Sequence, residues 1–166
     1  MSNFNSQKII APIMRFVNLK GIIALKDGML AILPLTVVGS LFLIIGQLPF
    51  EGLNQAIASV FGDTWTEPFM QVYSGTFAIM GLISCFSIGY SYAKNSGVEP
   101  LPAGVLSLSS YFILLKSSYV PAKGEPIGDA IAKVWFGGQG IIGAIIIGLV
   151  VGAIYTVFIQ RHIVIK

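Results

Sequence analysis

Charged residues are scarce in this sequence, and their scarcity excludes an ordinary soluble domain. Only 10% of the 166 residues are charged and 55% are hydrophobic, whereas soluble domains carry roughly 25% charged residues. The few basic residues are not clustered among aromatic residues, so the net charge of +3 does not indicate nucleic-acid binding. The composition predicts a protein whose partner is the lipid bilayer.

Cysteine and histidine are almost absent, which limits the chemistry. The single cysteine, Cys85, cannot form a disulfide within the chain, and the single histidine, His162, stands between Arg161 and the terminal Lys166. We interpret His162 as a solvated flank residue. A phosphate-binding glycine loop, a Gly-x-Ser-x-Gly elbow and paired metal ligands are all missing from the sequence. We therefore expect no catalytic residues, no metal and no cofactor.

Four stretches carry little or no charge. The first, Gly28 to Phe50, contains 23 uncharged residues and would reach roughly 35 Å as a helix, more than the ~30 Å hydrocarbon layer. It is too long for a signal peptide. The sequence predicts an all-α polytopic membrane protein of about four spans, near 29–48, 69–93, 100–120 and 137–160. The third is the weakest, because it is short and begins with two prolines.

Residues 5–26 precede the first span. Lys8, Arg15 and Lys26 would share one side of a helix, which predicts an interfacial amphipathic helix; an ordinary basic flank is the alternative. Lys26 and Asp27 should mark the point where the chain turns into the bilayer. Pro34 predicts a kink near residues 30–34. We expect no carboxylate embedded in a span.

Basic residues set the expected orientation. With a cytoplasmic N-terminus, seven lysines and arginines lie inside and three lie outside, and the first outer loop carries Glu51, Asp63 and Glu67 without a basic residue. The positive-inside rule therefore places both termini in the cytoplasm.

Small residues recur every four positions in two of the predicted spans. Such strips let two helices approach closely in a membrane, and the partner could be a helix of this chain or of a second subunit. The predicted helix-packing residues are Gly81, Cys85 and Gly89 in the second span, and Gly140, Ala144, Gly148 and Gly152 in the fourth.

Several polar residues lie at membrane depth. They could line a sugar path, but serine and threonine in membrane helices more often bond to the helix backbone. These residues are Gln71, Ser74, Thr76, Ser84, Ser87, Ser107, Ser109 and Ser110.

Three segments together resemble a known family. They are "LKDGMLAILPL" at the first span, "YAKNSGVEPLPAG" after the second, and "GGQG" before the fourth. From about residue 4 to the last residue, the chain is similar to the amino-terminal part of enzyme IIC, the membrane component of a bacterial sugar phosphotransferase system. The lactose, cellobiose and chitobiose group is the nearest match.

This resemblance implies that residues 1–166 form the scaffold and dimerisation part of a permease in the bacterial cell membrane. Family members are dimeric carriers of ten spans that take up a β-linked disaccharide, which enzyme IIB phosphorylates. Their sugar site lies in the second half, so the substrate-binding residues are expected beyond Lys166.

Two hypotheses from other classes compete with this one. One is a stand-alone four-helix membrane interaction module without transport activity of its own. It would pair through the ladder of small residues that recur at every fourth position from Gly140 to Thr156. The other, a small membrane enzyme, is disfavoured because acid and base pairs are missing.

Overall fold

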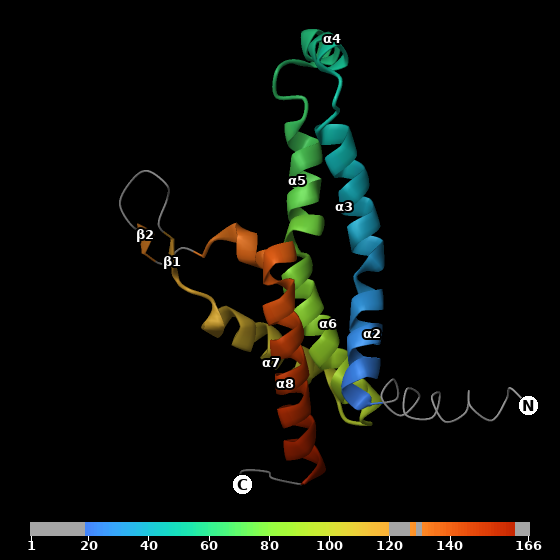
Figure 1. The fold of residues 1–166 in the computed structure, drawn as a ribbon, viewed down its shortest axis with the longest axis vertical. Coiled ribbons are helices and arrows are strands. Elements are labelled where there is room, and N and C mark those ends of the chain that lie inside the picture. The colour runs from blue at the N-terminus through green and yellow to red at the C-terminus, as the bar shows by residue number, and fades with distance from the viewer. Residues whose placement is uncertain (1–18, 120–126, 129–130, 162–166) are drawn as a thin grey trace, which may run out of the picture.

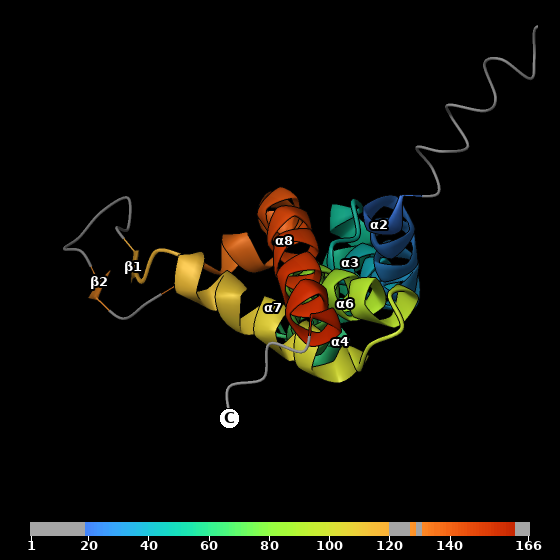
Figure 2. The ribbon, with the colours of Figure 1, turned by 90° about the horizontal axis from the view of Figure 1, so that it is seen from below.

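The computed structural model describes residues 19–119, 127–128 and 131–161. Its long helices form two antiparallel rods and a third helix beside them, with α7 leaving the bundle sideways (Figures 1 and 2). The elements, in chain order, are α2 (Lys20–Ala31), α3 (Leu33–Gly46), α4 (Glu51–Phe61), α5 (Glu67–Gly75), η1 (Phe77–Ile79), α6 (Met80–Asn95), α7 (Pro100–Leu114), β1 (Ser118–Tyr119), β2 (Ile127–Gly128), η2 (Lys133–Phe136), η3 (Gly138–Gly140) and α8 (Ile141–Gln160).

The first rod consists of α2 and α3 and spans Lys20–Gly46. Its 27 residues reach about 40 Å as a helix, which is long enough to cross a bilayer. The two helices are separated at Ile32, because Pro34 has no N–H to donate to the preceding turn. The predicted kink near residues 30–34 is confirmed.

The start of this rod differs from the expectation. Helix α2 runs unbroken through Lys26 and Asp27, so the chain does not turn there, and the carboxylate of Asp27 lies inside the first long helix. It is tolerated because Lys26 Nζ lies 3.3 Å from one oxygen and Asn95 Nδ2 donates to the other at 2.9 Å. Residues 5–18 of the predicted interfacial helix lie outside the described residues.

The second rod consists of α5, η1 and α6 and spans Glu67–Asn95. It runs antiparallel to the first rod (Figure 1). The helix breaks at Thr76, whose backbone leaves the helical region at φ −125° and ψ −88°. The Thr76 hydroxyl donates to the carbonyl of Val72 at 2.6 Å, which keeps a helix-end carbonyl satisfied at the break.

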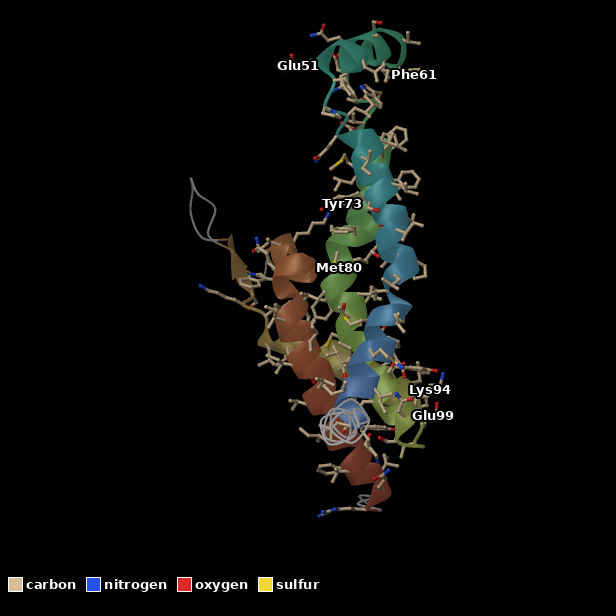
Figure 3. All side chains as sticks on the ribbon, turned by 45° about the vertical axis from the view of Figure 1, so that its right-hand side comes forward. Glu51, Phe61, Tyr73, Met80, Lys94 and Glu99 are labelled. Carbon is tan, nitrogen blue, oxygen red and sulfur yellow. The ribbon has the colours of Figure 1, made fainter. Side chains whose placement is uncertain are left out.

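Helix α4 connects the two rods and was not predicted. It crosses their tips, with Glu51 and Phe61 at its two ends (Figure 3). Its apolar residues recur at helical spacing, and three of them, Leu53, Val60 and Phe61, are exposed. An exposed apolar stripe on a helix at the end of membrane spans is typical of a helix lying in the membrane interface.

The third predicted span is shorter than expected, whereas the fourth is long enough to cross a membrane. Helix α7 ends at Leu114, earlier than the predicted residue 120. The chain then forms a two-residue antiparallel pairing, Ser118 with Gly128 and Tyr119 with Ile127. The fourth span, Gly138–Gln160, is long and apolar enough to cross a membrane. Within the described part of the chain, three long apolar helices and one shorter one confirm the all-α polytopic membrane fold.

Candidate functional site

Helix α6 is the central element of the packing. Helices α2, α7 and α8 all lie against it, as the view along the bundle shows (Figure 2). Ser84, Cys85 and Ile88 on α6 are completely buried. Burial of this kind on a helix surrounded by three others requires small residues at the points of closest approach.

The small-residue ladder of α8 faces α6 of the same chain. A Cβ atom added to Gly148 would lie 2.8 Å from the Cys85 carbonyl oxygen, and one added to Gly152 would lie 2.9 Å from Tyr92 Cβ. Ala144 is completely buried and joins Cys85 and Tyr111 in one cluster. The ladder is therefore occupied within the chain, which leaves a stand-alone module no free ladder through which to pair.

The strip on α6 has several partners rather than one. A Cβ added to Gly81 would meet the carbonyl oxygen of Phe136 at 2.7 Å, whereas Gly89 lies against Ser107 of α7. The Cys85 thiol donates to the Ser107 carbonyl at 3.2 Å. The small residues of α6 therefore contact α7 and the segment before α8 as well as α8 itself.

Gly140, the first predicted residue of the ladder, has its closest neighbours in Trp135 and Tyr111 rather than in α6. An added Cβ would collide with the carbonyl oxygen of Trp135 and the hydroxyl of Tyr111. This glycine therefore allows the chain to turn tightly before α8 begins.

Sequence reasoning missed three close approaches, two of them in the first rod. Gly28 lies against Ile88 of α6, with an added Cβ at 2.6 Å from Cγ1, and Gly39 lies equally close to Phe77 Cβ. Gly104 of α7 lies against the ring of Phe86. Gly28 and Gly39 are eleven residues apart, about three helical turns, so a search for glycines on one face would have found this pair.

Two buried hydroxyls among the candidates for a sugar path bond to helix backbone. Ser84 donates to the Met80 carbonyl at 2.6 Å and Ser107 to the Ala103 carbonyl at 2.8 Å, each one turn earlier, as Thr76 does. These hydroxyls are therefore not free to bind a sugar. The other candidates for a sugar path are exposed or half-buried: Gln71, Ser74, Ser87, Ser109 and Ser110.

An irregular segment lies against the middle of the second rod. Gly81, the midpoint of Glu67–Asn95, packs on the carbonyls of Phe136 and Gly137. The Tyr111 hydroxyl lies 2.6 Å from the Trp135 carbonyl oxygen and 3.1 Å from that of Gly140. Since lipid cannot satisfy backbone groups, Tyr111 supplies the donor that this break in regular structure needs.

Replacing Tyr111 with phenylalanine should therefore destabilise the fold. The ring would keep its packing, but the Trp135 carbonyl would lose its donor, at a cost of about 1–3 kcal/mol. Thermal aggregation in mild detergent, followed by gel filtration, would report this loss. Tyr155→Phe is the matched control, since no hydrogen bond of its hydroxyl occurs among the described residues. Equal aggregation midpoints for the two variants would contradict the role of the Tyr111 hydroxyl as donor to the Trp135 carbonyl.

Polar contacts tie the helices together at the end where α2 begins and α8 ends. Asn95 joins α6 to Asp27 of α2, and Gln160 Nε2 of α8 donates to the Ser96 carbonyl at 3.0 Å. Within the described ranges no three His, Cys, Asp or Glu side chains gather as metal ligands. The expectation that this chain holds no catalytic residue, metal or cofactor stays a prediction.

Comparison with known proteins gives consistent matches. The sequence model described as "Phosphotransferase system, EIIC" matches residues 26–166. The chain is 39% identical to the lichenan permease IIC component of Bacillus subtilis (strain 168) over 86% of this chain and 33% of the relative. It is 36% identical to the cellobiose-specific EIIC component of Geobacillus stearothermophilus, again over 86% and 33%. The chain thus spans about a third of the length of these relatives.

A solved structure has the same fold. The transporter ChbC, the IIC component of an N,N'-diacetylchitobiose-specific phosphotransferase system, superposes with a TM-score of 0.87. The two proteins are 30% identical, and the match covers 99% of this chain and 39% of ChbC. The arrangement of helices described above is therefore shared across nearly all of the chain.

Proposed function

Because the chain belongs to the phosphotransferase system EIIC family, we propose that it forms the amino-terminal scaffold of a sugar permease. The permease would carry a β-linked disaccharide of the cellobiose, chitobiose or lactose type across the bacterial cell membrane. The observation that carries this proposal is the match to a sugar transporter over 99% of this chain but only 39% of the transporter.

The packing supports a scaffold. Close backbone approaches hold α2, α7 and α8 against α6, which favours a rigid unit over a moving one. The irregular segment around Phe136 and Gly137 lies at mid-span, and backbone of this kind occurs at membrane depth only where protein or a water-filled cavity covers it. The remainder of a permease would provide that cover.

The proposed partners follow from the family. Enzyme IIB would phosphorylate the transported disaccharide, so this chain acts as a carrier and contributes no catalytic residue. A homodimer in the lipid bilayer is proposed as well. The cytoplasmic placement of the termini is supported by charge, because Lys20, Lys94 and Arg161 lie towards the end where α2 begins and α8 ends, opposite the acidic connection between the rods.

Uptake of labelled cellobiose tests the proposal. Cells without their own β-disaccharide permease would express this chain, the complementary part of the lichenan permease IIC component, or both. We expect uptake only when both are present, because the scaffold and the sugar-binding half are then complete. Labelled maltose, an α-linked disaccharide, serves as the control and should not enter.

Copurification gives the second measurement. Affinity-tagged chain should retain the complementary part in mild detergent. Uptake by the chain alone would contradict the scaffold role, and absence of both uptake and copurification would overturn the proposed function.

A further inference from the structure

An open cavity of about 500 Å³ lies where the break in the second rod meets the segment before α8. Figure 3 shows Tyr73 and Met80 along the second rod, beside the start of α8. The volume falls in the range of small-molecule sites, about 300–1,000 Å³. The lining residues used below are Tyr73, Phe77, Lys133, Gly137, Gly138 and Gln139.

The cavity lies at membrane depth. Its residue Phe77 is four positions from Gly81, the midpoint of the second rod. The 29 residues of this rod reach about 43 Å, roughly 13 Å more than the hydrocarbon layer. Even if all of that excess lay on one side, Gly81 would stay within about 7 Å of the midplane and Phe77, one turn away, within about 13 Å, which is inside the ~15 Å half-thickness of the hydrocarbon layer.

Broken helices supply polar backbone at this depth. The second rod leaves helical geometry at Thr76, and the chain before α8 does so at Gly137, with φ −94° and ψ −146°. In transporters, interrupted membrane helices near the midplane place backbone donors and acceptors at the substrate. Here two such interruptions border one cavity.

The side chains around the cavity suit a neutral sugar. Tyr73 and Phe77 are stacked, with ring centroids 5.7 Å apart and an interplanar angle of 21°, which gives an apolar wall for the C–H face of a pyranose ring. The Gln139 amide can donate and accept, and Lys133 can donate. A few polar groups set against an aromatic wall are typical of small-ligand sites.

We infer that this cavity is a sugar contact on the scaffold that binds a β-linked disaccharide on its way through the permease. The inference rests on the proposed function and adds a second contact to the sugar site expected in the other half of the permease. Gln139 bonds to sugar hydroxyls, and the Tyr73 and Phe77 rings pack against the sugar ring.

Trp135 provides a built-in reporter for binding. It lies two residues from Lys133, its side chain is 45% exposed, and the chain holds only one other tryptophan, Trp65. In the purified Trp65→Phe chain, cellobiose should shift the Trp135 emission in a saturable manner. Maltose and inorganic phosphate, added separately, should produce no saturable shift.

Matched glutamine variants locate the site. Gln139→Ala, made in the Trp65→Phe chain, should weaken cellobiose binding at least tenfold, because the amide that bonds to the hydroxyls is lost. Gln55→Ala should leave binding unchanged, since this exposed glutamine of α4 does not line the cavity. Tyr73→Leu, which removes the aromatic wall, should also weaken binding and guards against a local effect of Gln139 on Trp135.

Three outcomes would overturn the inference: no saturable response to cellobiose, a response to phosphate in its place, or equal binding by the two glutamine variants. The cellobiose uptake assay separates this failure from failure of the proposed function. Uptake restored by both parts together, with no Trp135 response, would remove the sugar contact and leave the scaffold role intact.

Discussion

Replacing Gly148 with leucine is expected to separate α8 from α6 and to abolish the folded bundle. A single Cβ at this position already lies 2.8 Å from the Cys85 carbonyl oxygen and 3.1 Å from Ile88 Cβ. Forcing extra methylenes into a packed core costs about 1–3 kcal/mol, and four carbons placed against a backbone carbonyl reach or exceed that range. This is a large part of the ~5–15 kcal/mol that stabilises a typical protein.

Gly52→Leu is the matched control, because Gly52 also lies in a helix but has no atom within 4 Å of an added Cβ. After purification in mild detergent, Gly148→Leu should aggregate on gel filtration while Gly52→Leu elutes as the parent does. If both variants eluted as the parent does, the close packing of α8 on α6 would not be needed for the fold.

Replacing Ile88 with alanine is expected to give the second-largest loss, about 2 kcal/mol. Ile88 is completely buried, with Gly28 of α2 and Gly148 of α8 both in contact with it. Lipid is about as apolar as the protein interior, so moving the side chain from lipid into the protein changes the free energy little. The free-energy cost of the cavity left behind therefore dominates. About 80 Å³ of lost side chain at roughly 24 cal/mol per Å³ gives this figure.

The control is Ile113→Ala, since Ile113 is 80% exposed and its truncation leaves no cavity. The fraction of protein that stays monodisperse after heating would be compared for the two variants. If the two variants lost half of their monodisperse protein at the same temperature, the packing of Ile88 between α2 and α8 would contribute nothing to stability beyond the apolar character of the side chain.

Charge distribution predicted the long helices because water-free surroundings exclude charged side chains over the length of a span. It did not predict α4, whose 11 residues are too few for a span and lie within an acidic connection. It also placed the end of α7 too late, because hydropathy continues past Leu114 whereas the backbone becomes extended at Leu115.

The contacts of the candidate site were only partly predictable. The spacing of Gly148 and Gly152 indicated a packing face on α8. That α6 is its partner could not be predicted, because this pairing depends on the route of α7, which connects α6 to α8. The cavity beside Tyr73 could not be predicted from the sequence. Gln139 lies at this cavity only because regular helix is interrupted at Thr76 and Gly137, and no local sequence pattern predicts these interruptions. Asp27 was placed at a turn since its partner, Asn95, is 68 residues away.

The central position of α6 sets an order of assembly during synthesis. Two of its three neighbours, α7 and α8, leave the ribosome after it, and α6 and α8 run in the same direction (Figure 1). When α6 first enters the membrane beside α2, Cys85 therefore has neither Ser107 nor Ala144 to contact. The bundle closes only when α8 inserts, so during translation α6 passes through a stage in which lipid or the insertion machinery covers its small-residue face.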